Sequence, residues 1–117
     1  PHNYEKNCVV YTGTHDNDTL CGWYKVLDPE DLKLSQKYMN NANTPKRQIH
    51  WDFIRLALAS VADLCIIPLQ DYLGLGSEAR INTPSTLGKN WRWRMKQGCL
   101  TKELADRIRE LTTLYGR

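Results

Sequence analysis

The chain has 117 residues, of which 41% are hydrophobic and 25% charged, a composition typical of a single globular domain. Lys and Arg outnumber Asp and Glu by 16 to 13, and a net charge of +3 is too small to indicate a nucleic-acid partner. No apolar run reaches the roughly 18 to 20 residues of a membrane span, so no membrane partner is predicted. The chain begins without Met and without a signal-peptide pattern, and we expect a cut N-terminal end.

The four cysteines, at positions 8, 21, 65 and 99, form no C-x-x-C pair, and we interpret them as small buried hydrophobes rather than nucleophiles. The stretch at residues 16–19 fails the calcium-loop pattern, which requires alternating ligands followed by glycine, because Leu20 stands at the third ligand position. We therefore predict no metal and no cofactor. A chain this rich in apolar residues needs no disulfides, so a reducing cytoplasm is the simplest location.

Two short apolar runs, residues 8–12 and 64–69, predict β-strands. Both runs are continuously apolar rather than alternating, which is typical of strands covered on both faces in parallel sheets. The helical pattern between the strands predicts a right-handed βαβ crossover. Because a sheet of two strands is marginal by itself, the sequence implies neighbouring strands that it does not contain.

Helix signals flank these strands. Asp28 followed by proline predicts a helix over residues 29–39, and Thr44 with the next proline predicts a second, apolar helix up to about residue 61. Thr101 is the predicted N-cap of a final amphipathic helix. Residues 74–96 predict a long ordered loop with short turns.

The first candidate site is the polar run Thr14-His15-Asp16-Asn17-Asp18-Thr19, directly after the first strand. Its side chains can bind sugar hydroxyls, and the carboxyl ends of strands carry the chemistry of α/β folds. The alternative is a capped turn, in which Asp18 or Thr19 begins a short helix. After the second strand, Gln70 and Asp71 could line the same site, although Asp71 could equally cap the next helical turn.

The second candidate is the loop that ends in Trp91-Arg92-Trp93-Arg94. Indole and guanidinium planes stack on ligands, and at this net charge a sugar is favoured over a nucleic-acid base. The alternative is structural: the tryptophans pack the loop onto the body, and the arginines at 80, 92 and 94 pair with carboxylates such as Glu78 and Asp71. We interpret His50, near a helix start, as structural or solvated.

Three segments in combination resemble a known family: residues 10–23, 68–80 and 82–94. In this order they resemble the C-terminal part of the 4-α-glucanotransferases, the amylomaltases or disproportionating enzymes of glycoside hydrolase family 77. The resemblance implies an α/β fold, a (β/α)₈ barrel of the TIM type. It also implies the transfer of an α-1,4-glucan segment to the 4-hydroxyl of an acceptor sugar with retention.

The resemblance also implies roles for single residues. Asp16 matches the third catalytic aspartate, which holds the hydroxyls of the sugar at the cleavage site. His15 matches a histidine that binds the same sugar, and Asn82 matches a polar contact from the loop after the last strand. Further substrate-binding candidates are Asn17, Asp18, Gln70 and Trp91. Residues 84–90 depart from the family, because many members carry a second glycine there.

By the same resemblance, the runs at 8–12 and 64–69 are the seventh and eighth barrel strands. The nucleophilic aspartate and the acid/base glutamate follow the fourth and fifth strands of the family and are absent from this chain. We therefore expect residues 1–117 to be a single C-terminal fragment of a catalytic barrel, acting on maltooligosaccharides within its parent and inactive alone.

Two other interpretations stay open at this stage. The chain could be a non-catalytic maltooligosaccharide-binding module that uses Trp91, Trp93 and His15. It could also be a fragment that self-associates, because unpaired strand edges invite pairing with a second copy.

Overall fold

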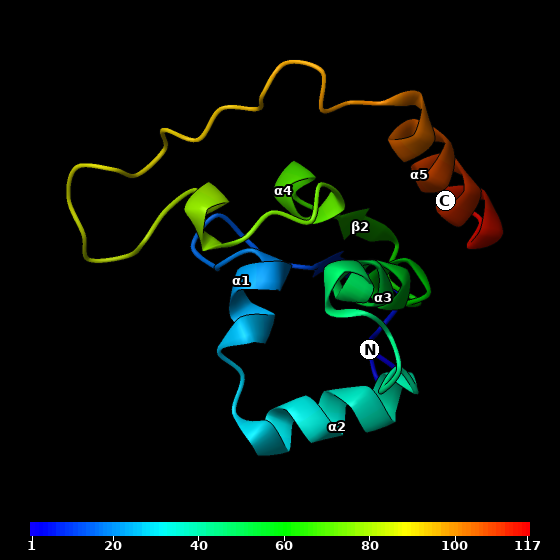
Figure 1. Ribbon diagram of the computed structural model, residues 1–117. Helices are drawn as coiled ribbons and strands as arrows, with labels where there is room; N and C mark the ends of the chain where they lie inside the picture. The colour runs from blue at the N-terminus through cyan, green and yellow to red at the C-terminus, as the bar shows by residue number, and fades with distance from the viewer.

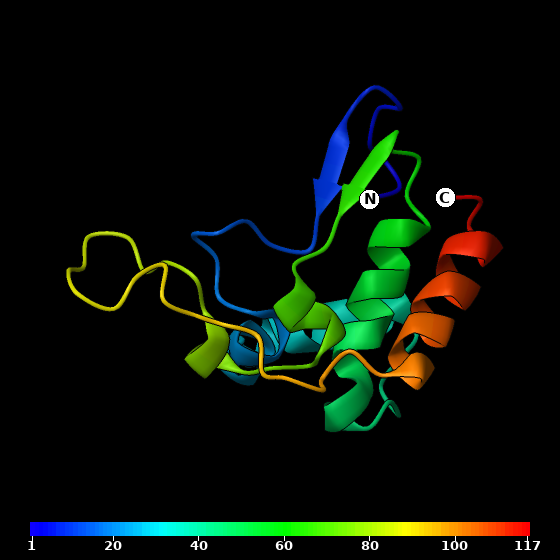
Figure 2. The ribbon, with the colours of Figure 1, turned by 90° about the horizontal axis from the view of Figure 1, so that it is seen from above.

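The computed structural model describes residues 1–117 and contains one parallel sheet of two strands, β1 (Val9–Tyr11) and β2 (Leu64–Ile66). Val10 of β1 lies opposite Cys65 of β2, and the two arrows in Figure 2 run in the same direction. The predicted parallel pairing of two strands that are joined through helices is confirmed. The remaining elements are α1 (Leu20–Lys25), α2 (Pro29–Met39), η1 (Lys46–Gln48), α3 (Ile49–Leu58), α4 (Leu69–Tyr72), η2 (Ser77–Ala79) and α5 (Lys102–Leu114).

Two of the predicted helix starts are confirmed by their capping contacts. Asp28 accepts a hydrogen bond from the Glu30 amide at 2.9 Å ahead of α2, and Thr101 accepts from the Leu104 amide at 3.2 Å ahead of α5. Thr19, rather than Asp18, caps α1 and accepts from the Gly22 amide at 3.1 Å. In these three helices a side chain satisfies an otherwise free backbone N–H group. The predicted cap at Thr44 does not form, because neither η1 nor α3 begins with a side-chain capping bond.

Both strands are shorter than the sequence predicted. The run at 64–69 ends as a strand at Ile66, because Pro68 has no amide hydrogen for the ladder and instead begins α4, with φ −56°. The run at 8–12 ends at Tyr11, and the Thr12 hydroxyl bonds to a side chain outside the ladder. The second predicted helix opens with the separate turn η1 before α3.

Helix α3 lies at the centre of the packing (Figure 1). Its Ile54 is completely buried and belongs to a cluster that joins α3 to α1 and α5. A second cluster of Val10, Ala57 and Ala62 packs β1 against α3. Burial of one such aliphatic side chain contributes about 1.5 to 3 kcal/mol, so these two clusters fix the sheet relative to the helices.

One sheet face is not covered within this chain. The side chains that point away from α3 are between 41% and 52% exposed: Val9, Tyr11, Leu64 and Ile66. The chain itself therefore covers one of the two sheet faces, and cover on the second face by neighbouring elements stays a prediction. Helix α2 likewise buries none of its residues.

None of the helices combines the length and the hydrophobicity that a membrane span requires.

His50 holds the start of the long loop against α3. Its ring is 5% exposed and lies so close to Gly74 that a Cβ atom added there would be 2.8 Å from ring carbon Cε1. Gly74 also has φ +63°, a conformation that glycine adopts without strain. Burial and the nearby Arg107 lower the pKa of His50 to about 4, so its ring is neutral at pH 7. We predicted that His50 is either structural or solvated, and its burial fits the structural role.

Candidate functional site

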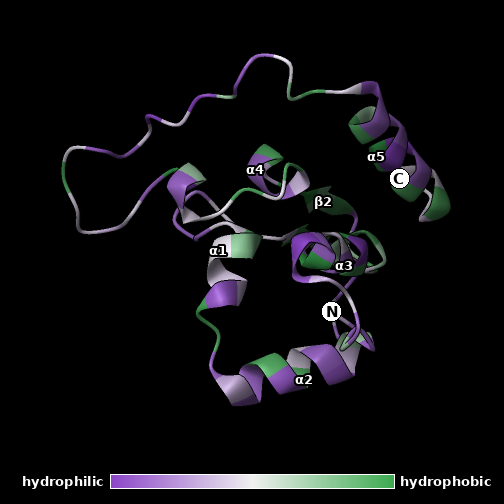
Figure 3. Cartoon of the chain, viewed as in Figure 1, coloured by the Kyte–Doolittle hydropathy of each residue, from purple (hydrophilic) through white to green (hydrophobic).

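Two polar segments meet at the carboxyl ends of the strands. Residues 12–19 leave β1, and residues 67–91 leave β2 through α4 and η2 (Figure 2). Figure 3 shows that the long loop beyond η2 is mostly hydrophilic. The Asn82 amide donates to the His15 carbonyl at 3.1 Å, which joins the two segments backbone to backbone.

Asp16 is the centre of the cluster. Its carboxylate oxygen Oδ1 accepts a hydrogen bond from Asn82 Nδ2 at 2.6 Å and lies 3.4 Å from His15 Nε2. The Asp16 and His15 side chains are 48% and 53% exposed, so both are open to a ligand. The structure thus brings together the three residues that the sequence analysis ranked first, although Asn82 is 66 residues from Asp16.

Trp91 completes this cluster. Its ring centroid lies 5.1 Å from that of His15, and its amide donates to the Ile81 carbonyl at 2.7 Å. The backbone at Trp91 has φ 63°, which is uncommon for a residue with a bulky side chain and costs of order 1 to 3 kcal/mol. The strained turn places a largely exposed indole beside His15.

Asn17 and Asp18, also predicted as binding residues, have partners within the chain. Asn17 Oδ1 accepts from the amide and the hydroxyl of Thr14, at 2.8 and 2.9 Å. Asp18 Oδ2 accepts from the Ser77 hydroxyl at 2.6 Å, and Asp18 Oδ1 accepts from the Thr19 amide. These contacts shape the loop and tie it to η2, and a ligand role for either residue stays a prediction.

Gln70 and Asp71 are buried behind the cluster. Gln70 Nε2 donates to the Ala79 carbonyl at 3.3 Å. Asp71, 2% exposed, accepts from the Thr12 hydroxyl at 2.6 Å and from the Leu20 amide at 2.8 Å. Burial raises the pKa of the Asp71 carboxyl, and its two hydrogen bonds partly oppose that rise. Asp71 does not cap the turn that follows β2; it binds the first residue of α1.

The arginine contacts differ from the predicted ion pairs. Arg80 and Arg94 donate to main-chain carbonyls, and no ion pair with Glu78 or Asp71 forms. Trp93 lines a pocket together with Leu75 and Cys99, and Trp91 does not line that pocket. The two indoles therefore have different neighbours, and the binding module that would use both stays an open alternative.

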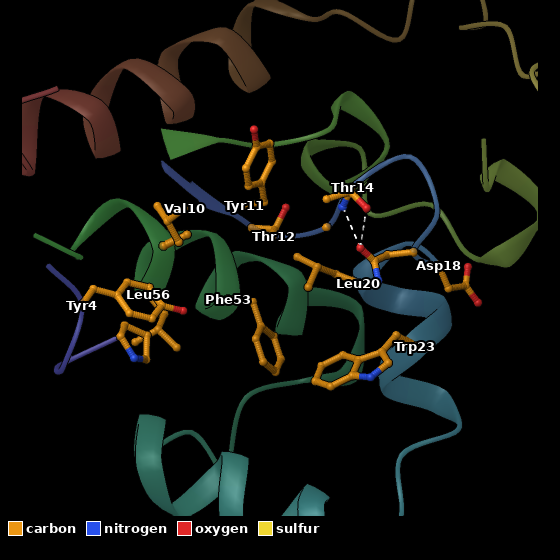
Figure 4. Close-up of a pocket in the computed structure, with 14 residues that line it drawn as sticks. Tyr4, Val10, Tyr11, Thr12, Thr14, Asp18, Leu20, Trp23, Phe53 and Leu56 are labelled. Carbon is orange, nitrogen blue, oxygen red and sulfur yellow. Dashed lines mark hydrogen bonds between the residues drawn. The ribbon is translucent and has the colours of Figure 1, made fainter. Parts of the chain in front are cut away.

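Another pocket, with a volume of about 340 Å³, lies beside β1 and α3 (Figure 4). Figure 4 shows that Phe53, Trp23 and Leu56 form its apolar wall, while Thr14 and Asp18 lie toward one end. Neither His15 nor Asp16 lines this pocket. The candidate chemistry is therefore on the open cluster around Asp16 and not in this cavity.

The cysteine thiols are in surroundings that do not favour reactivity. Burial raises the pKa of the Cys21 and Cys65 thiols, which disfavours the nucleophilic thiolate. All four cysteines are free. No group of three or more His, Cys, Asp or Glu side chains is placed to hold a metal ion.

Fold and site together define an α/β segment that presents an open carboxylate, an imidazole and an amide at the carboxyl ends of parallel strands. A sequence model of the family described as 4-α-glucanotransferase matches residues 1–101. The chain belongs to this family.

The similarity extends over the whole chain in several relatives. The chain is 51% identical to the 4-α-glucanotransferase of Clostridium butyricum and 48% identical to the chloroplastic/amyloplastic enzyme of Arabidopsis thaliana, covering 24% and 20% of their lengths. The structure superposes on the amylomaltase of Streptococcus agalactiae, solved in complex with acarbose, with a TM-score of 0.93 and 37% identity. That match covers the whole chain and 23% of the amylomaltase. The chain thus spans about a quarter of the length of these relatives. The predicted cytoplasmic location stays a prediction.

Proposed function

We propose that residues 1–117 form the C-terminal segment of the barrel of a 4-α-glucanotransferase. In this proposal β1 and β2 are the seventh and eighth strands of a (β/α)₈ barrel, a fold of about 250 residues. The uncovered sheet face supports the assignment, because barrel strands bury one face against the interior and the other against helices. The observation that carries the function is the contact of Asn82 with Asp16 beside His15, at the strand ends where barrel enzymes hold their sites.

The substrate in this proposal is an α-1,4-glucan. A retaining transfer needs a nucleophilic carboxylate and an acid/base carboxyl about 5 Å apart, with a transition state that resembles an oxocarbenium ion. Both groups come from the part of the enzyme outside this chain. The acarbose complex of the similar amylomaltase supports an oligosaccharide ligand.

Within this reaction Asp16 accepts hydrogen bonds from hydroxyls of the sugar whose glycosidic bond breaks. Those bonds strengthen as positive charge develops on the ring, so they stabilise the transition state more than the bound substrate. His15, 3.4 Å away, binds the same sugar, while Asn82 fixes the Asp16 carboxylate and offers its amide to the ligand. The exposed Trp91 ring supplies an apolar surface against which the sugar packs.

The experiment that tests this function uses the full-length enzyme containing this chain and maltotriose as the only substrate. We expect transfer, which releases glucose and builds maltooligosaccharides longer than maltotriose, as resolved by chromatography. Equal amounts of glucose and maltose without longer products would show hydrolysis and contradict the proposal. A sample lacking enzyme controls for spontaneous breakdown.

A further inference from the structure

Arg80 connects the two halves of the candidate site through main-chain carbonyls. Its Nη2 donates to the Asp16 carbonyl at 2.6 Å, and its Nε donates to the Asn82 carbonyl at 2.9 Å. Asp16 and Asn82 are the two residues whose side chains bond to each other at the centre of the cluster. The guanidinium, the two carbonyls and the side-chain contact therefore form one closed set of hydrogen bonds.

Contacts of neighbouring residues fix the backbone position of Arg80. The preceding residue, Ala79, is 1% exposed, and its carbonyl accepts from the buried Gln70 side chain. The Arg80 amide donates to the Ser77 carbonyl at 3.1 Å, and Ser77 in turn donates to Asp18 in the loop that carries Asp16. Arg80 consequently extends from a rigid turn and not from the free part of the loop.

The chemistry of the side chain suits this task. A guanidinium is planar and presents Nε–H and Nη2–H in a fixed fork, so it can hold two acceptors at a defined separation. A lysine ammonium is a point charge on a flexible stem and does not reproduce that fork. Arg80 forms no ion pair with a carboxylate of this chain, and its side chain bonds to these two carbonyls instead.

We propose that Arg80 is a positioning residue that sets the orientation of the Asp16 carboxylate and the Asn82 amide toward the sugar. This inference rests on the proposed function of Asp16. Arg80 need not touch the substrate: it holds the main chain on both sides of the contact that defines the site. A misplacement of about 1 Å in a catalytic group can lower a rate by about 10²-fold, so the effect should be on turnover.

The test compares Arg80→Lys with Arg47→Lys in the full-length enzyme. Arg47 lies in η1, away from the cluster, is exposed and forms no hydrogen bond or ion pair through its side chain, so it controls for the exchange of cation type. For Arg80→Lys we expect kcat for maltotriose disproportionation to fall about 10- to 100-fold. KM should stay within about threefold, and circular dichroism should show an unchanged melting temperature. Arg47→Lys should retain the wild-type kcat.

A second measurement separates positioning from a structural role. In Arg80→Ala, added guanidinium chloride should restore part of kcat, whereas ammonium chloride at the same concentration should not, because only guanidinium presents the planar fork of donors that matches the two carbonyls. A kcat for Arg80→Lys equal to that of Arg47→Lys, or equal responses to the two salts, would overturn the proposal. Asp16→Asn is assayed in parallel: normal turnover there refutes the proposed function itself, whereas lost turnover there with unaffected Arg80 variants refutes only the role of Arg80.

Discussion

Replacing Asp16 by asparagine in the full-length enzyme should lower turnover of maltotriose by about 10²- to 10⁴-fold. Hydrogen bonds to ring hydroxyls that strengthen in the transition state contribute several kcal/mol, and each 1.36 kcal/mol corresponds to a factor of ten in rate. The change removes the negative charge but keeps the size of the side chain. Initial rates of glucose release, measured with a coupled assay, provide kcat and KM.

The fold should tolerate this substitution. Asp16 is half-exposed, and an asparagine at this position keeps an oxygen that can accept from Asn82, so the substitution removes the charge without burying an unsatisfied group. The matched control is Asp63→Asn, because Asp63 is also half-exposed and forms an ion pair with Lys6 at 2.7 Å, outside the cluster. The control should retain wild-type turnover. Near-normal kcat in Asp16→Asn would refute the role assigned to this carboxylate.

Replacing Asp71 by alanine should cause a large loss of stability, about 3 to 5 kcal/mol in the free energy of unfolding. The substitution leaves the Thr12 hydroxyl and the Leu20 amide without their acceptor, and an unsatisfied buried polar group costs about 1 to 3 kcal/mol. Asp71→Asn keeps one acceptor oxygen and should therefore lose less stability than Asp71→Ala. Urea titration of the full-length enzyme, followed by tryptophan fluorescence, measures the difference.

The control for Asp71 is again a surface aspartate. Asp63→Ala breaks only the exposed ion pair with Lys6, and such pairs contribute between about 0 and 1 kcal/mol. If Asp71→Ala unfolds at the same urea concentration as Asp63→Ala, the buried carboxylate does not hold β1 and α1 together in the way the structure indicates.

Much of the fold follows from local sequence signals. Asp28 and Thr101 are predicted N-caps and act as such, and the apolar runs on either side of a helical segment predict the parallel crossover. The strand ends could not be predicted, because the run at 64–69 is apolar throughout and only the geometry at Pro68 separates strand from helix. The predicted cover of the sheet is confirmed on the face against α3, whereas cover on the other face stays a prediction, because the sequence implies neighbouring elements that it does not contain.

The candidate site was only partly predictable for a different reason. His15 and Asp16 follow a strand and were found from local sequence, and Asn82 was found from the family resemblance. The bonds from Arg80 to the carbonyls of Asp16 and Asn82 could not be predicted from the sequence. An arginine near carboxylates in the sequence suggests ion pairs, and only the structure shows that its acceptors are main-chain carbonyls. Likewise, the positive φ at Trp91 has no sequence signal, since glycine is the residue that usually marks that conformation.

The most direct test of the account compares the purified 117-residue chain with the full-length enzyme at equal molar concentration. The measurement is glucose release from maltotriose over several hours. We predict sustained transfer by the full-length enzyme and no release above background by the chain alone. One open carboxylate cannot both attack the anomeric carbon and protonate the leaving oxygen. Measurable disproportionation by the isolated chain, abolished by Asp16→Asn, would contradict the claim that these residues complete a site whose other carboxylates lie outside the chain.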